Sequence, residues 1–200
     1  MREGRLGAGD CLWLADPTRL EMAVVMEPEV DRARCPAMAL LAMVAFGDAL
    51  GALAPPEVAV TYRWPNAIDV NGAEVGQVNL AMPPAGADWL VVGLGVTVAS
   101  TDPVGSEPGE NVERTTLAEE GCQDLSSEAL TEAVARHWVS WLHEWSEEGL
   151  APVAAQWLSR RDAKDRLAGF EGRFRGLDDE GNAIVERGGS AVLDLGEALL

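Results

Sequence analysis

The feature that most constrains this chain is the stretch 58–82, VAVTYRWPNAIDVNGAEVGQVNLAM. Apolar residues alternate at positions 58, 60 and 62, which predicts a half-buried strand. Pro65 ends that strand, because proline cannot donate to a ladder and pushes the residue before it out of helical geometry. Asn71-Gly72 then predicts a tight hairpin between two further strands. The tetrapeptide Arg63-Trp64-Pro65-Asn66 is therefore expected at a sharp turn on rigid backbone.

Four more elements follow from periodicity and from helix start and stop signals. The apolar runs 20–26 and 89–99 have strand length, and the second contains Gly93 and Gly95. Residues 37–53 follow Pro36 and are apolar nearly all round, which predicts a deeply buried helix. Residues 127–148 predict a helix that either Ser126 or Ser127 caps and that Gly149 ends. Its row of tryptophans indicates a core face, and His137 and His143 do not have the spacing of a zinc pair.

The charge of the chain argues against nucleic acid as a partner. Its 200 residues carry 15 Lys+Arg and 33 Asp+Glu, a formal net charge of -18, which repels phosphates. The odd number of cysteines, 3, is typical of reduced thiols in a cytoplasmic protein. We found no apolar run of the ~18 residues that a membrane span needs, so no membrane association is expected.

Several segments, taken in order, resemble one protein family. The Arg63 to Asn66 turn and its hairpin are similar to the ligand-binding core of biotin protein ligases and lipoate ligases. Residues 91–96, VVGLGV, resemble the Gly-x-Gly strand that follows in that family, and 147–152, EEGLAP, with Trp157 resembles its last ligase-domain helix. Residues 169–200 resemble its small C-terminal barrel.

The resemblance implies an α+β fold, namely a mixed sheet of the class II synthetase and biotin ligase type with packed helices. It also implies a small C-terminal SH3-like β-barrel. We expect a ligase-like domain at 1–158, a charged connector at 159–168 and a small β domain at 169–200. Because the given sequence starts inside the expected ligase-like domain, we expect no N-terminal DNA-binding segment of the kind that some relatives carry.

The resemblance further implies a function. Family ligases activate biotin or lipoate with ATP and Mg²⁺, and pass the acyl group to a lysine of a carrier protein domain. It assigns substrate binding to six residues and gives no catalytic residue or metal ligand. A homodimer through an exposed sheet edge is compatible with the family. The six residues are Arg63, Trp64, Asn66, Gly76, Gly93 and Gly95.

Two positions depart from the family pattern. Ala67 stands where the family has an aspartate, and Glu74 stands at the position of the hairpin lysine. A unit charge at ~4 Å is worth about 4 kcal/mol at an effective dielectric of ~20, so this replacement opposes a developing negative charge. We therefore expect impaired or altered ligase activity. The alternative is a non-catalytic protein of the same fold that binds a small acid or a partner protein.

Two local features have more than one interpretation. Gly93 and Gly95 indicate either the close approach of a ligand or a β-bulge. The glycine-rich residues 1–10 are either a mobile terminus or a remnant of the loop that closes over the adenylate in the family.

Overall fold

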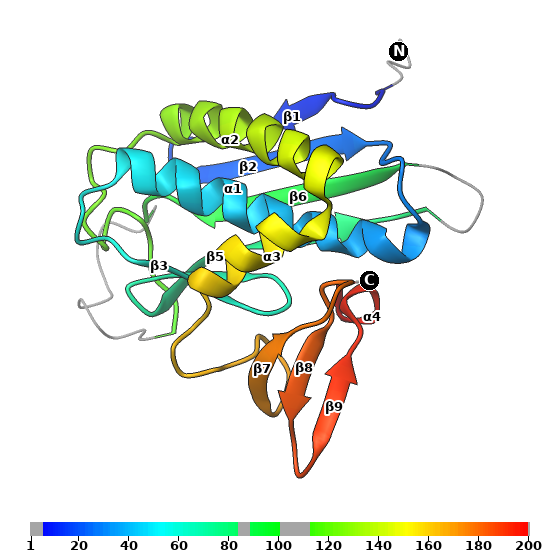
Figure 1. The fold of residues 1–200 in the computed structure, drawn as a ribbon. Coiled ribbons are helices and arrows are strands. Elements are labelled where there is room, and N and C mark those ends of the chain that lie inside the picture. The colour runs from blue at the N-terminus through cyan, green and yellow to red at the C-terminus, as the bar shows by residue number, and fades with distance from the viewer. Residues whose placement is uncertain (1–5, 84–88, 101–112, 200) are drawn as a thin grey trace.

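The computed structural model describes residues 6–83, 89–100 and 113–199. Its centre is a six-stranded sheet in the order β1-β2-β6-β5-β4-β3, in which every neighbouring pair is antiparallel (Figure 1). Residues 1–5, which belong to the predicted N-terminal loop, lie outside the described residues. The strands are β1 (Cys11–Trp13), β2 (Arg19–Met26), β3 (Val60–Arg63), β4 (Ala67–Val70), β5 (Ala73–Ala81) and β6 (Leu90–Thr97).

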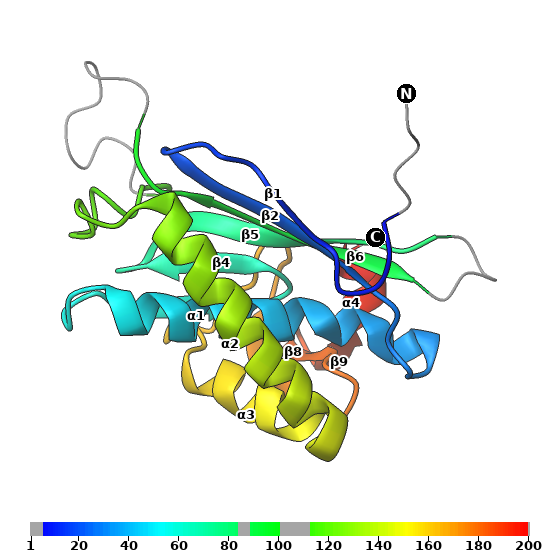
Figure 2. The same cartoon turned by 90° about the horizontal axis from the view of Figure 1, so that it is seen from above.

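Helices lie on one face of this sheet, as Figure 2 shows, and in the part of the chain that the structure describes no helix lies on the other, here called the open face. A 3-10 helix, η1 (Arg32–Ala37), leads into α1 (Met38–Leu53), which packs against both α2 (Ser127–Glu148) and α3 (Leu150–Ser159). The predicted helix 127–148 is confirmed: the Ser126 side chain accepts a hydrogen bond from the Ala129 amide at 3.1 Å. Gly149 ends the helix at φ 72°.

Strand β6 shows how the two faces differ. Leu90, Val92, Leu94 and Val96 are buried toward the helices, and the residues between them alternate onto the open face. Gly93 and Gly95 are thus both on the open face, in the middle of the sheet. The sequence therefore forms a floor without side chains at this point.

One helical segment passes a composition test for a membrane span. The helical stretch Arg32–Leu53 is long and apolar enough to cross a membrane by composition, with a mean hydropathy of 1.7. In this fold, however, 78% of its apolar window is buried inside the protein. The segment is the core helix, and its composition follows from its packing against the sheet and against α2 and α3.

A small C-terminal β unit completes the fold, as expected. It is a three-stranded antiparallel sheet made of β7 (Arg173–Leu177), β8 (Ala183–Glu186) and β9 (Ser190–Leu193). The sequence did not predict the short helix α4 (Leu195–Leu199) that follows. Phe174, Val185 and Leu195 are buried in the same hydrophobic core as α1, so this unit leans on the larger one.

Candidate functional site

Arg63, at the end of β3, is held by two carboxylates. Its Nε and Nη2 donate to Asp69 Oδ2 and Oδ1 at 2.8 and 2.9 Å, and Nη2 also donates to Glu74 Oε2 at 2.7 Å. Asp69 is fully buried. Hydrogen bonding to Asp69 raises the pKa of Arg63 above its ordinary value. The guanidinium is therefore committed to neighbouring strands of its own sheet.

Trp64 is turned toward the C-terminal unit. It is fully buried, and its indole Nε1 donates to the carbonyl of Gly181 at 3.1 Å. Its ring lies 5.6 Å from that of Phe170, and its own carbonyl accepts from the Ala168 amide at 2.7 Å. The peptide bond from Trp64 to Pro65 is cis. These contacts tie the turn to the connector and to the small sheet.

Asn66 and Gly76 belong to the pairing of β5. The Asn66 side-chain amide donates to the Val78 carbonyl at 2.9 Å, and the Val78 amide donates back to the Asn66 carbonyl at 3.0 Å. A Cβ on Gly76 would lie 2.2 Å from the Gly95 carbonyl oxygen, so only glycine fits there. Both residues have a structural reason for their identity.

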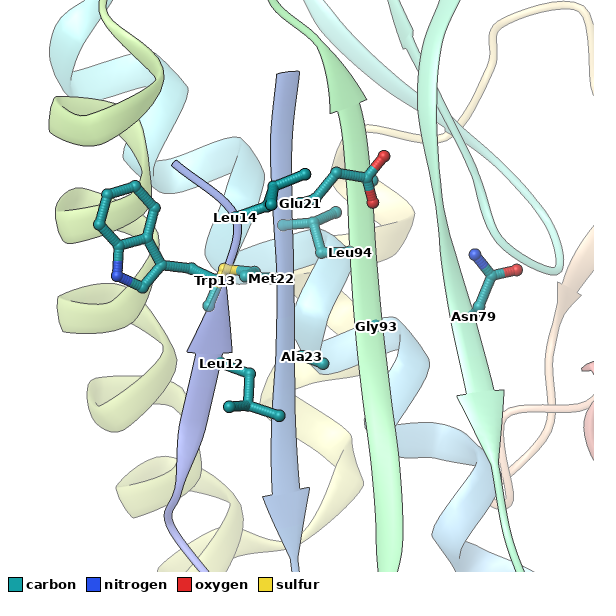
Figure 3. A pocket seen from close by; sticks show the side chains of 10 residues that line it. Leu12, Trp13, Leu14, Glu21, Met22, Ala23, Asn79, Gly93 and Leu94 are labelled. Carbon is teal, nitrogen blue, oxygen red and sulfur yellow. The ribbon is translucent and has the colours of Figure 1, made fainter. Parts of the chain in front are cut away.

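A hollow of about 370 Å³ lies on the open face of the sheet (Figure 3). Leu12 and Leu14 border it on the β1 side, while the Trp13 ring is directed away toward the start of α2. Glu21 and Asn79 reach over it from β2 and β5. The lining residues are Leu12, Trp13, Leu14, Glu21, Met22, Ala23, Asn79, Gly93, Leu94 and Gly95.

The two predicted glycines form the floor of this hollow. A Cβ on Gly93 would have no atom closer than 3.8 Å, whereas one on Gly95 would meet the Glu21 carboxylate at 3.1 Å. The pairing of β6 with β2 runs without a register shift through Ala23↔Gly93 and Glu21↔Gly95. The bulge interpretation of these glycines is therefore wrong.

A second hollow of about 220 Å³ continues the first along the same face. The two share Glu21, Asn79 and Gly95. Arg19, Glu74 and Arg114 line the continuation, together with Val75, Gly76, Gln77, Thr97 and Thr115. Among the six predicted residues, Gly76, Gly93 and Gly95 line one or both hollows, and Arg63, Trp64 and Asn66 do not.

Glu74 links two arginines at this end. Its Oε2 accepts from Arg63, and its Oε1 lies 3.7 Å from Nε of Arg114. The backbone of the same segment is paired as well, since the Glu74 amide donates to the Glu113 carbonyl and the Thr115 amide to the Glu74 carbonyl, both at 2.9 Å. Position 74 thus holds cations in place, in addition to carrying a negative charge itself.

Sequence reasoning missed Glu21, Asn79 and Arg114. The alternation of β2 and β5 could have placed Glu21 and Asn79 on the open face with the glycines. Nothing in the sequence near Arg114 indicated its partner 40 residues earlier in the hairpin. Within the described ranges, no group of three or more His, Cys, Asp or Glu side chains could hold a metal ion.

The sequence matches known proteins along most of its length. A model described as the biotin/lipoate A/B protein ligase family matches residues 1–159. A biotin--[acetyl-CoA-carboxylase] ligase of Paracoccus denitrificans is 26% identical over 186 residues, 88% of this chain and 77% of that protein.

Solved structures agree with that result. A biotin protein ligase-like protein of unknown function from Silicibacter sp. TM1040 superposes with a TM-score of 0.84 and 32% identity, covering 98% of this chain and 86% of that one. The Aquifex aeolicus biotin protein ligase in complex with biotin and ATP gives a TM-score of 0.76 at 18% identity, over 96% and 88% of the two chains. At that identity the second likeness shows the fold alone.

Proposed function

This chain belongs to the biotin/lipoate A/B protein ligase family, and from that premise we propose that it binds a biotin-like or lipoate-like carboxylic acid on the open face of its sheet. We propose further that it activates the acid with ATP and Mg²⁺ and transfers it to a carrier protein, at a rate far below that of a typical ligase. The Aquifex relative was solved with biotin and ATP, which makes this pair the first to test.

The observation that carries the proposal is the glycine floor of the open face. Gly93 and Gly95 leave a hollow of about 370 Å³ in the middle of a sheet whose other face packs against helices. Glycine is disfavoured inside strands, so two glycines separated by a single residue need an explanation, such as the close approach of a ligand. Polar Glu21 and Asn79 beside apolar Leu12 and Leu14 suit a small amphipathic molecule.

Slow activation is argued from charge. Forming an acyl-adenylate develops negative charge on phosphate oxygens, and cations fixed nearby must stabilise it. Arg63 is already shared between Asp69 and Glu74, with only 16% of its side chain exposed. Ala67, where the family pattern has an aspartate, is buried and has no polar atom in its side chain.

Calorimetric titration tests acid binding directly. We expect heat with biotin or lipoate, and loss of that heat in Gly93→Val, whose side chain would fill the open space above residue 93. Gly176→Val is the matched control, because Gly176 also lies in a strand with no atom near its Cβ position and is far from the hollow in sequence and sheet. Equal binding by both variants and the wild type would place the ligand elsewhere.

The alternative function is acid binding without activation, and the Arg63, Asp69 and Glu74 cluster favours it. Pyrophosphate exchange with each acid separates the two candidates. Slow but acid-dependent exchange supports a weak ligase. Binding of the acid with exchange at the level of a protein-free blank supports the non-catalytic protein.

A further inference from the structure

We infer that the bound acid lies lengthwise across the two hollows, with its apolar end beside Leu12 and Leu14 and its carboxylate at Arg114. The inference rests on the proposed function and adds the residue that recognises the acid group. Arg114 belongs to none of the segments that resemble the family's motifs. It reaches the site because its segment pairs with residue 74 at the start of β5.

The first step is the continuity of the floor. The two hollows share Glu21, Asn79 and Gly95, so one molecule can occupy both. On β6, the floor of the two hollows taken together runs from Gly93 to Thr97. At ~3.3 Å per residue this span is about 13 Å, enough for a ring with a short alkyl acid chain.

The second step is the polarity of the two ends. Leu12 and Leu14 are 49% and 57% exposed at the β1 end, where a ligand would remove apolar surface from water. The other end carries Arg19 and Arg114. Between these two ends, the Glu21 carboxylate lies close to Gly95, where it would repel the carboxylate of a bound acid. The acid group is therefore directed past Glu21 to the arginine end.

The third step compares the arginines. Arg63 uses Nε and Nη2 in bonds of 2.7 to 2.9 Å, and Arg19 places Nε and Nη2 within 2.8 Å of one oxygen of Glu21. Within residues 6–83, 89–100 and 113–199, the Arg114 side chain makes one ion pair, from Nε to Glu74 at 3.7 Å, and 76% of it is exposed. A guanidinium has five N–H donors, so Arg114 can bind an incoming carboxylate through Nη1 and Nη2 while Glu74 keeps it near the groove.

The test compares an acid with its primary amide, which has the same shape and no charge. The affinities of biotin and biotinamide, and of lipoic acid and lipoamide, are measured by calorimetry for the wild type, Arg114→Ala and Arg114→Lys. We expect the wild type to prefer the acid by about tenfold, as a charged hydrogen bond allows. Arg114→Ala should lose that preference while binding the amide as before, and Arg114→Lys should keep part of it.

Arg187→Ala is the matched control, since Arg187 is an exposed arginine whose ion pair with Glu171 lies in the C-terminal unit. It should retain the full preference. An unchanged ratio of acid to amide affinity in Arg114→Ala would overturn the inference and leave the proposed function intact. A wild type that binds none of the four probes would overturn the proposed function itself.

Discussion

At the scale of single residues, two glycines of one sheet have different tasks. Gly76 is required by packing, because a Cβ there would lie 2.2 Å from the Gly95 carbonyl and 2.8 Å from the Val96 Cα, both backbone atoms. Gly93 meets no such limit, since its nearest neighbour would be 3.8 Å away. One glycine therefore lets two strands approach, and the other keeps a surface open.

A pair of alanine substitutions separates these tasks. Gly76→Ala should lower the free energy of unfolding by about 2 to 3 kcal/mol, because backbone atoms cannot move aside as a flexible side chain can. Gly93→Ala should change it by less than about 0.5 kcal/mol, as an open surface position does. Urea denaturation followed by circular dichroism measures both. Equal losses in the two variants would contradict the assignment.

Tyr62 offers a second test at this scale. It is the single tyrosine of the chain, and burial raises its pKa to about 12. Its hydroxyl lies 3.4 Å from Nη1 of Arg160, and its ring stacks on Trp157 with centroids 5.8 Å apart. In the unfolded chain a tyrosine has a pKa of ~10, so the folded state holds this proton more tightly.

Stability should therefore fall as the pH rises from about 10 to 12. Below pH ~10 both states keep the proton and the contribution is complete; above it the unfolded chain ionises first, and about 2 kcal/mol is lost by pH ~12. Because the chain has one tyrosine, the ultraviolet absorbance of tyrosinate, measured as the pH is raised, follows the ionisation of Tyr62 directly. In Tyr62→Phe, the free energy of unfolding should fall less steeply between pH ~10 and ~12. If Tyr62 of the folded wild type ionised near the ordinary tyrosine pKa, the burial argument would be refuted.

At the scale of elements, the turn from Arg63 to Asn66 joins three parts of the molecule. Arg63 contacts β4 and β5, Asn66 fixes β5 at Val78, and Trp64 reaches the loop before β8. The connector passes beside it, since the Asp162 amide donates to the Tyr62 carbonyl at 2.9 Å. The motif that indicated a ligand from sequence thus also carries the attachment of the C-terminal unit.

Substitution of Trp64 tests that attachment. Trp64→Phe removes the indole N–H, leaves the Gly181 carbonyl without its donor and opens a small cavity, at a cost of about 2 kcal/mol. Hydrogen exchange should quicken most in β7 to β9. Trp89→Phe is the matched control. Because Trp89 is 43% exposed, this change should alter neither the free energy of unfolding nor hydrogen exchange by much. Uniform exchange across both sheets would argue against a local role.

Sequence reasoning predicted the elements better than the site, and the reason is physical. Periodicity, the Ser126 cap and the Asn71-Gly72 hairpin are local signals, so α1, α2 and the strands from β2 to β6 followed from them. Strand β1 has three residues, too few for a period, and was missed. The pairing of Glu74 with Arg63 and Arg114 depends on contacts between distant segments, which residue types alone do not specify.

At the scale of the whole molecule, one hydrophobic core extends through both sheets. Phe174 and Val185 of the small unit belong to the same buried cluster as Phe46 of α1 and Val96 of β6. A unit of about 30 residues is too small to bury a sufficient core alone. The proposed boundaries, 1–158 and 169–200, therefore separate two structural units that we expect to unfold together.

Unfolding should accordingly be a single transition. Tryptophan fluorescence reports mainly on the large unit, and far-ultraviolet circular dichroism reports on both, so the two curves should coincide in urea. A variant with Phe174→Ala, in the small unit, should shift both curves together by about 3 kcal/mol. An early step seen by only one probe would show that the small unit melts by itself.

The sheet ends differently on its two sides. On the β3 side, the amide and carbonyl of Tyr62 are both taken by the connector, in bonds to Arg160 and Asp162 of 2.8 and 2.9 Å. On the other side, β1 is the last strand in the part of the chain that the structure describes, and its recorded backbone bonds go to β2. If two copies of this chain pair edge to edge, we therefore expect them to meet through β1, where such pairing joins two copies and leaves no second β1 edge for a third.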